Sequence, residues 1–289
     1  KSSPVPAQAP PNAFTADAEH ARYTARPLNA EATMPALLTA ADPAPFEMLN
    51  PDGASALVLV ADHAGNAVPA ALFDLGLPAE ELNRHIGIDI GTAWIGEKLS
   101  ADFDAVLVRA TYSRLVVDLN RPIESPTSMP PVSDGTAVPG NHDLTPAARA
   151  ARLEAIFHPY HQAIAAAVTR VAARGQTPII VSLHSFTPRI DGTDRPWHLG
   201  FLYDRDDRLA RLMIAEMRRD PGLLVGDNQP YSGRNPSGFT IKHHAENPGR
   251  AHVTVEFRQD LVDTPEKAAD WAGRFAAALR TSLARFTKG

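Results

Sequence analysis

Runs of consecutive apolar residues alternate along the chain with longer segments in which apolar residues recur every three or four positions. The continuous runs are typical of strands buried on both faces, and the second pattern is typical of helices that bury one face. We expect strands over 56–61, 105–110, 115–119, 178–183, 199–203, 239–242 and 252–257. We expect helices over 79–100, 145–174, 208–218 and 265–286, with Pro159 kinking or interrupting the second of them.

Strands that alternate with helices predict an α/β fold in which helices cover both faces of the sheet. We therefore expect a three-layer α/β/α domain with a mixed, mostly parallel sheet. Ligands of such sheets bind beyond the carboxyl ends of the strands. The residues directly after each apolar run are thus the first candidates for chemistry.

The first 45 residues differ from the rest of the chain because they are rich in Ala, Pro and Thr and show no sustained period. We expect an extended or partly disordered arm over 1–45 and a single domain over 46–289. Residues 122–143 form a long Pro-rich segment, which is typical of a functional loop. Residues 231–233 are either a lid over a site or a plain loop.

The composition excludes several classes of protein. The 289 residues carry a net charge of −5, which argues against general nucleic-acid binding but allows a local basic pocket. No apolar run approaches the ~20 residues that span a bilayer, so we expect no membrane segment. The chain has no cysteine, which removes thiolate ligands and Cys nucleophiles and fits a reducing, cytoplasmic compartment. The chain begins with Lys rather than Met, which is consistent with a trimmed chain, so an exported form is kept as a minor alternative.

Three predicted strands end in side chains that can hold a metal ion or move a proton. His63 follows the first, within Asp-His-Ala-Gly-Asn at 62–66, His184 follows another, and Glu256 and Arg258 lie in a third. Two imidazoles with one oxygen ligand are a typical zinc site, and a carboxylate that is not a ligand can act as general base. The structural alternative is that the histidines only make hydrogen bonds and that Glu256 pairs with an arginine.

A second group of polar residues surrounds the apolar run at 115–119. It includes Arg114, Asn120 and Arg121, and arginine binds carboxylates through two parallel hydrogen bonds. The functional interpretation is a clamp for an acidic substrate. The alternative is a structural ion pair between Asp118 and either arginine.

Two histidine pairs and one serine support weaker hypotheses. His158 and His161 share a helix face if Pro159 leaves the helix intact, although a packing or surface role is the favoured interpretation of that spacing. Neighbouring histidines at 243 and 244 would point to opposite faces of a strand and cannot enter one site. Ser185 lacks the Gly-x-Ser-x-Gly elbow, so a serine nucleophile is not expected.

Seven motifs in order resemble those of the N-formylglutamate amidohydrolases, whose fold is similar to that of the zinc carboxypeptidases (phosphorylase/hydrolase-like). They are DHAGNAVP at 62–69, HIGIDIG at 85–91, YSRLVVDLNRP at 112–122, PGNHDLT at 139–145, HPYH at 158–161, SLHSFTP at 182–188 and VTVEFRQD at 253–260. The resemblance covers about 46–285. It implies that Glu256 is catalytic and that His63 and His184 bind the metal. It also implies substrate contacts from the following residues: Arg114, Asn120, Arg121, Asn141, Ser185 and Arg258.

The third metal ligand is the point where the sequence departs from the zinc carboxypeptidases. Those enzymes place a ligand glutamate three residues after the first histidine, where this chain has Asn66. A neutral amide is a poorer zinc ligand than a carboxylate. Asn66, Asp62 and Asp89 are therefore three alternatives for this position.

The resemblance implies hydrolysis of the amide bond of a small N-acyl amino acid, N-formyl-L-glutamate giving formate and glutamate, in histidine degradation. It also implies a divalent metal, zinc, as cofactor and a small acidic molecule as partner. Two alternatives stay open. One is a carboxypeptidase-like hydrolase of another peptide or N-acyl substrate, with 122–143 and 231–233 setting the pocket size. The other is a catalytically inactive binder of acidic ligands, suggested by Asn66.

Overall fold

A computed structural model describes residues 36–234 and 238–287 of the chain. Residues 1–35 of the predicted arm therefore lie outside the described residues. The end of that arm, residues 36–45, lies within them. There Leu37 and Leu38 pack against the apolar core, and Asp42 accepts a hydrogen bond from the backbone N–H of Ala70.

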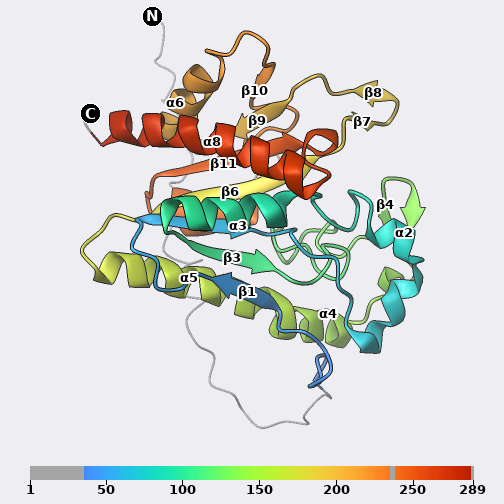
Figure 1. The fold of residues 1–289 in the computed structure, drawn as a ribbon. Helices are drawn as coiled ribbons and strands as arrows, with labels where there is room; N and C mark the ends of the chain where they lie inside the picture. Colours follow the sequence, from blue (N-terminus) through green and yellow to red (C-terminus); the bar gives the residue numbers. More distant parts are fainter. Residues whose placement is uncertain (1–35, 235–237, 288–289) are drawn as a thin grey trace, which may run out of the picture. The chain divides into compact units, whose positions relative to one another are not determined.

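A seven-stranded sheet forms the middle layer of the domain (Figure 1). Its strands are β1 (Phe46–Leu49), β2 (Leu57–Ala61), β3 (Val106–Ala110), β6 (Ile179–Phe186), β9 (Leu199–Leu202), β10 (Val225–Asp227) and β11 (His252–Arg258). The spatial order is β1-β3-β2-β6-β11-β9-β10. All neighbours pair in parallel except β1 with β3 and β11 with β9. The sheet is mixed and mostly parallel, as the sequence predicts.

Helices cover both faces of this sheet (Figure 1). One face carries α3 (Thr92–Phe103), α6 (Arg208–Met217) and α8 (Pro265–Phe286). The other carries α4 (Pro146–Arg152), the π-helical turn η3 (Leu153–Phe157) and α5 (His158–Ala173). Shorter helical segments are η1 (Ala70–Gly76), α2 (Ala79–Leu82), η2 (Pro139–Asn141), α7 (Phe239–Ile241), the π-helical turn η4 (Lys242–Glu246) and η5 (Gln259–Leu261).

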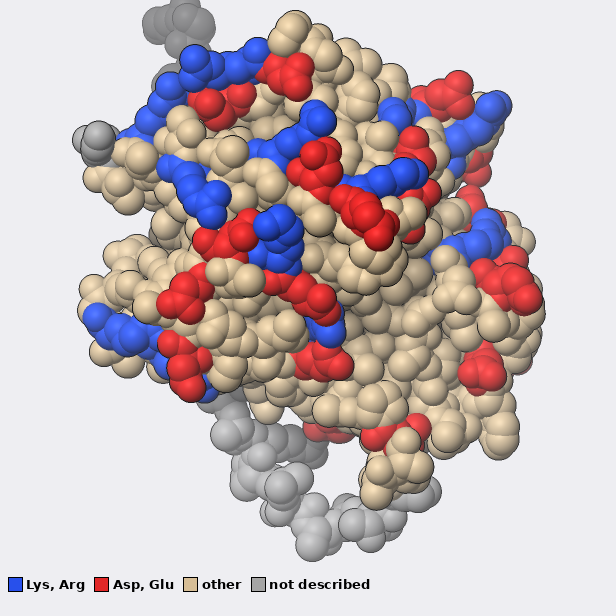
Figure 2. Space-filling model, in the orientation of Figure 1, with Lys and Arg blue, Asp and Glu red and all other residues tan. Residues whose placement is uncertain are grey.

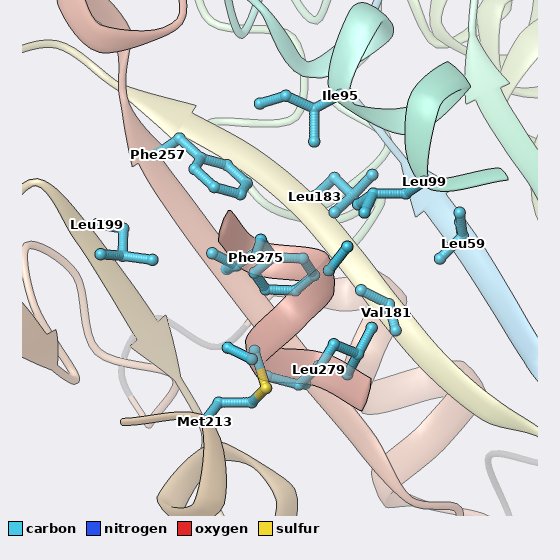
Figure 3. Packing of buried hydrophobic residues seen from close by; sticks show 14 of the residues in the cluster. Leu59, Ile95, Leu99, Val181, Leu183, Leu199, Met213, Phe257, Phe275 and Leu279 are labelled. Atoms are coloured by element: carbon cyan, nitrogen blue, oxygen red, sulfur yellow. The ribbon is translucent and has the colours of Figure 1, made fainter. Parts of the chain in front are cut away.

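The strand β2 explains why two cores form. All of its residues are buried, with Leu57 and Leu59 in one apolar cluster and Val58 and Val60 in the other. Because successive side chains of a strand point to opposite faces, a fully apolar strand must be covered on both sides. Figure 3 shows the first cluster, where Phe275 of α8 packs toward the sheet residues Leu183 and Phe257.

Two small hairpins lie in the loops that connect the main elements. They are β4 (Val132–Ser133) with β5 (Thr136–Ala137), and β7 (Arg189–Ile190) with β8 (Thr193–Asp194). Gly135 and Gly192 turn them with φ values of +75° and +74°. The first hairpin lies inside the predicted loop 122–143.

The predicted helix over 79–100 is wrong in its middle. Helix α2 ends at Leu82 and α3 begins at Thr92, so the nine intervening positions form turns. Two glycines in this stretch favour a break, and Gly91 has φ +88°, a left-handed conformation that suits glycine. The break also turns the backbone of Asp89 toward His63, whose carbonyl accepts a hydrogen bond of 2.9 Å from the Asp89 N–H.

Two predicted strands are also wrong. Residues 115–119 are buried, but they form turns in which the N–H of Val116 bonds to the carbonyl of Ser113. Residues 239–242 belong to α7 and to the start of η4. Short apolar runs do not distinguish a strand from a buried turn or a helix. The run at 115–119 is fully buried, whereas Phe239 and Ile241 are only partly buried against the core.

The helical segment predicted over 145–174 is present as α4, η3 and α5 in succession. The side chain of Thr145 caps its start by accepting a hydrogen bond from the N–H of Ala148. Pro159 lies in the first turn of α5, directly after the π-helical turn η3. A π-helical turn absorbs the missing proline N–H by locally changing the hydrogen-bond pattern, so the chain continues as helix.

Charges of both signs are mixed over the surface. Figure 2 shows Lys and Arg side chains interspersed with Asp and Glu on the face it draws. Arg109, for example, pairs with both Glu47 and Glu97. Within residues 36–234 and 238–287, no helix combines the length and the apolar character needed to cross a bilayer.

Candidate active site

Three neighbouring strands bring His63, His184 and Glu256 to one edge of the sheet. Strand β6 lies between β2 and β11 and runs parallel to both, and its His184 is paired in register with Glu256 of β11. His63 follows the end of β2, and its ring centroid lies 5.1 Å from that of His184. The predicted convergence of these strand ends is confirmed.

Asp89 forms the third corner of this cluster. It comes from the break between α2 and α3, and potential ligand atoms of His63, Asp89 and His184 all lie within 4.8 Å of one another. The Oδ2 of Asp89 is 3.3 Å from Nδ1 of His63 and 2.9 Å from Nδ1 of His184. All three residues are buried, and the described part of the chain contains no second such group of His, Asp or Glu.

Hydrogen bonds fix Asp89 from several sides. The Ser185 N–H donates to its Oδ2 at 3.3 Å, and the Arg114 guanidinium donates to its Oδ1 at 3.2 Å. Its backbone carbonyl accepts from the Thr92 hydroxyl at 2.8 Å, at the first turn of α3. The carboxylate is therefore held in place before any ligand arrives.

The outer nitrogen of each histidine faces a second carboxylate. Nε2 of His63 lies 2.8 Å from Oδ1 of Asp118, and Asp118 accepts two hydrogen bonds from Arg114. Nε2 of His184 lies 3.4 Å from Oδ2 of Asp62. With the outer nitrogens so placed, both histidines present Nδ1 toward Asp89. Carboxylates behind ligand histidines are a common feature of protein metal sites.

The charges of the cluster favour a cation. Burial works against the ionised form of Asp118, but Arg114 and His63 outweigh it and lower the pKa of Asp118 well below its usual range. Burial likewise opposes the charge of Asp89, but His63, His184 and Arg114 lower its pKa too. For His63 and His184, burial is outweighed by neighbouring carboxylates, which raise both pKa values. Two imidazoles and one ionised carboxylate are the donor set that a divalent metal such as zinc takes, so these residues fit the ion.

Glu256 differs from the other carboxylates of the cluster because no hydrogen bond or ion pair with a described residue stabilises its charge. Its side chain is buried, and its Oε2 has no hydrogen-bond partner among residues 36–234 and 238–287. Burial raises the pKa of Glu256 to about 7, partly opposed by His184. The alternative in which Glu256 pairs with an arginine is not seen, because the described residues include no arginine within 4 Å of its carboxylate. A carboxyl group with this pKa can accept and donate a proton at neutral pH.

These residues line one cavity of about 390 Å³, a size typical of small-molecule sites. His63, Asp89, His184 and Glu256 are on its wall. Its other lining residues include the following: Arg114, Asn120, Arg121, Ser185, Tyr203, Tyr231, Ser232, Gly233 and Lys242. Residues 231–233 therefore form part of the cavity wall. None of the described residues 122–143 does, so the expectation that this loop sets the pocket size is wrong.

The cations of the cavity fall into two kinds. Arg114 is committed to Asp89 and Asp118 through three hydrogen bonds. The structural alternative for Asp118 is thus correct for Arg114 and not for Arg121. The side chains of Arg121 and Lys242 form no ion pair or hydrogen bond with any residue that the structure describes. They are the cavity's uncommitted positive charges.

Asn120 and Ser185 line the cavity as predicted. The Oδ1 of Asn120 accepts from the Thr240 N–H at 3.1 Å, and its Nδ2 lies 3.4 Å from Nε2 of His184. The Ser185 hydroxyl donates to the carbonyl of Ile90 at 2.8 Å. Ser185 therefore holds the segment that carries Asp89.

Three predicted site residues lie elsewhere. Asn66 donates through Nδ2 to Asn83 at 2.7 Å and does not line the cavity, whereas Asp89 lies beside His63 and His184. Asn141 donates a hydrogen bond to the carbonyl of Leu115 and accepts one from Arg152. Arg258 forms an ion pair with Asp260. None of the three lines the cavity. Each is a polar residue inside or beside a family motif, and sequence alone did not separate supporting from lining positions.

The remaining histidines lie away from the cavity wall. His161 and His244 contact one another at 3.1 Å between Nδ1 and Nε2, and Nε2 of His161 donates to the carbonyl of Leu119. Burial lowers the pKa of His161 to about 4 and that of His244 to about 2. Both are neutral structural residues at neutral pH. The expectation that His243 and His244 lie in a strand fails with the strand itself.

Sequence reasoning missed two residues that the structure places at the site. Lys242 was assigned to the wrong predicted strand, which hid its position on the cavity wall. Tyr160, inside the HPYH motif, donates its hydroxyl proton to Oδ1 of Asp62 at 2.8 Å. The HPYH motif was the sequence signal available for Tyr160.

Comparisons with known proteins agree with this geometry. A family model described as N-formylglutamate amidohydrolase matches residues 55–262. The crystal structure of gene product Atu2144 from Agrobacterium tumefaciens is similar, with 34% identity, coverage of 87% of this chain and 99% of that chain, and a TM-score of 0.84. The N-formylglutamate amidohydrolase from Ralstonia eutropha JMP134 shares 23% identity over 83% of this chain and 97% of that chain, with a TM-score of 0.62. A search of curated proteins gave no significant match.

Proposed function

The chain belongs to the N-formylglutamate amidohydrolase family, and from this premise we propose that it hydrolyses N-formyl-L-glutamate to formate and glutamate with a divalent metal ion, zinc. Members of this family are amide-bond hydrolases. The observation that carries the proposal is one cavity that joins His63, Asp89 and His184 to the unpaired carboxyl group of Glu256.

His63, Asp89 and His184 would hold the metal, with the Nδ1 atoms and the carboxylate as donors. When bound, zinc supplies a Lewis acid that polarises a carbonyl oxygen and lowers the pKa of a water molecule to about 7. The ligands keep their positions because Nε2 of His63 contacts Asp118 and because the Ser185 N–H donates a hydrogen bond to Asp89. Asn66 no longer supports an inactive binder, because the carboxylate of Asp89 lies beside His63 and His184 and can be the third metal ligand.

Glu256 moves the proton in this scheme. Its carboxylate accepts a proton from the attacking water, whose oxygen forms the new bond to the formyl carbon. The C–N bond then breaks, and Glu256 passes the same proton to the leaving nitrogen. A pKa near 7 suits both transfers, because the group is neither too weak a base nor too weak an acid at neutral pH.

Arg121 and Lys242 support an acidic substrate. N-formylglutamate carries two carboxylates, and the cavity wall holds two cations without a described carboxylate partner. Arg121 takes the substrate-binding role that the resemblance implies for it, and Asn120 lies beside it on the cavity wall. Arg114 is a positioning residue for Asp89 and Asp118, because its hydrogen bonds are directed to them.

A hydrolase of other N-acyl amino acids or of peptides is the competing function. The experiment that separates them measures formate or amine release from a panel: N-formylglutamate, N-formylleucine, N-acetylglutamate and a C-terminal glutamyl dipeptide. We expect the largest specificity constant for N-formylglutamate. A larger value for the dipeptide would favour the carboxypeptidase-like alternative, and no release from any compound would favour a binder.

We place this reaction in the cytoplasm and in histidine degradation, as the family resemblance implies. The absence of cysteine supports a reducing compartment. Activity in the cytoplasmic fraction of a producing cell, compared with the exported fraction, tests this assignment.

A further inference from the structure

We propose that Tyr160 and Asp62 act as a pair of positioning residues that fix the ring of His184 for metal binding. The inference rests on the proposed function, because it concerns the same metal site. It also gives a role to the HPYH motif, which supplies Tyr160 and which the mechanism above does not use.

Asp62 is a fully buried carboxylate, with an exposed fraction of 0%. Its Oδ1 accepts the hydroxyl proton of Tyr160 at 2.8 Å, and Tyr160 is itself completely buried. Its Oδ2 has no hydrogen bond within the described residues and lies 3.4 Å from Nε2 of His184. A buried carboxylate oxygen without a partner is costly, so this oxygen is set to accept a proton from the nearby ring.

The chemistry of a metal-bound histidine explains that arrangement. When Nδ1 of a neutral imidazole donates its lone pair to a metal, the ring proton must sit on Nε2. Nε2–H then needs an acceptor, and a carboxylate in this position fixes both the tautomer and the ring orientation. For His184, Oδ2 of Asp62 is the acceptor in reach.

Asn120, the other polar group near this nitrogen, cannot take the same role. Its Oδ1 already accepts from the Thr240 N–H, which directs its Nδ2 toward His184 at a distance of 3.4 Å. An amide NH₂ is a donor and gives no acceptor to Nε2–H. The geometry therefore leaves the acceptor role to Asp62.

The two histidines of the site are supported in parallel but by different groups. Behind His63, Asp118 is held by the guanidinium of Arg114 and by the Asn120 N–H. Behind His184, Asp62 is held by a neutral phenol. The position of that phenol depends on α5, whose first turn follows the π-helical turn η3 and carries Pro159 next to Tyr160.

Tyr160→Phe is the direct test, because it removes one hydroxyl and preserves the packing of the ring. Tyr112→Phe is the matched control, since Tyr112 is also buried and its hydroxyl donates to the Pro43 carbonyl at 2.6 Å, away from the cavity. Asp62→Asn is the second variant. For each metal-free protein, zinc affinity is measured by competition with a chromophoric chelator, and the visible spectrum of the cobalt(II) form reports the ligand geometry.

We expect Tyr160→Phe to weaken zinc binding by about 10-fold and Asp62→Asn by up to about 100-fold, the range for lost partners of ligand histidines. The cobalt(II) bands should shift in both, while Tyr112→Phe should match the wild type. Thermal unfolding of the metal-free proteins checks that Tyr160→Phe and Tyr112→Phe lose similar stability. A purely structural hydroxyl would lower the melting temperature and leave zinc affinity and spectrum unchanged.

The outcomes separate this inference from the proposed function. If wild type binds zinc and releases formate from N-formylglutamate, but both variants bind zinc as tightly as wild type, the positioning role is overturned alone. If wild type binds no zinc, the metal site itself is overturned and the inference with it. Weaker zinc binding in Tyr160→Phe and Asp62→Asn, with Tyr112→Phe unchanged, supports the pair.

Discussion

Glu256 and Asp89 line the same cavity, but their environments push their pKa values in opposite directions. Asp89 receives hydrogen bonds from Arg114 and Ser185, so its charge is stabilised in spite of burial. Glu256 has no donor at Oε2, and burial raises its pKa to about 7. The difference between the two pKa values suits each residue to a different function, Asp89 to holding a cation and Glu256 to transferring a proton.

Glu256→Gln should lower kcat by roughly 100-fold or more, the usual scale for a lost general base. The amide is close in size but cannot accept a proton, so zinc content should stay at the wild-type level. Turnover is measured by formate release and zinc by elemental analysis of the same samples. Loss of zinc in this variant would make Glu256 a ligand instead, and unchanged turnover would remove it from the mechanism.

Arg121→Ala should reduce the specificity constant for N-formylglutamate far more than that for N-formylleucine. The acidic substrate loses charge-assisted hydrogen bonds worth roughly 1.5–3 kcal/mol each, about 10-fold to 100-fold in the constant. Arg274→Ala is the control, because Arg274 pairs with Asp270 on the exposed side of α8 and does not line the cavity. An equal loss on both substrates would refute a carboxylate role for Arg121.

At the element scale, the strand-end rule predicted the site well and apolar patterning predicted the connections poorly. His63, His184 and Glu256 were found because parallel strands deliver their ends to one edge, a property that sequence pattern reports. The apolar side chains at 115–119 are buried in turns, and Phe239 and Ile241 pack partly buried against the core from a helical segment, so neither run pairs as a strand. The third residue of the metal cluster could not be chosen from sequence among Asn66, Asp62 and Asp89. The choice depends on how the chain turns between α2 and α3, and no local sequence pattern encodes that path.

Gly91 controls that path, so Gly91→Ala should be more damaging than a matched glycine change. A Cβ at Gly91 would lie 2.3 Å from the carbonyl oxygen of Val262, whereas Gly192, at a similar positive φ, has open space around it. Both variants should lose roughly 1–2 kcal/mol from the left-handed backbone. Gly91→Ala should lose more and should also bind less zinc, because Asp89 must shift.

Denaturant unfolding of the two metal-free variants, together with a zinc titration, measures both effects. If Gly91→Ala and Gly192→Ala behaved alike in stability and in zinc binding, the segment between α2 and α3 would not be what positions Asp89.

At the scale of the whole molecule, the cluster links folding to metal and to protons. In the metal-free protein the raised pKa values of His63 and His184 mean that these rings hold protons that stabilise the fold at low pH. That contribution is fully present below the pKa of an unfolded histidine and is lost as the pH rises through the raised values. Zinc must displace these protons, so it competes with them at low pH and binds more freely at high pH.

Zinc should therefore raise the melting temperature more at pH 8 than at pH 6. At a free concentration about 100 times the Kd, binding contributes about 2.7 kcal/mol to the stability of the folded chain. Differential scanning calorimetry with and without zinc at both pH values measures the shift, and Asp89→Ala should show little of it. A shift that is the same at both pH values would contradict proton displacement from the two histidines.

Titration of the metal-free protein with zinc, while formate release from N-formylglutamate is followed, tests the proposed metal-dependent hydrolysis directly. We expect the chelator-treated protein to release no formate, and we expect activity to rise in proportion to added zinc and to stop rising at one ion per chain. Formate release that is unaffected by removal of the metal, or its absence at every zinc concentration, would contradict a metal-dependent N-formylglutamate amidohydrolase built on His63, Asp89 and His184.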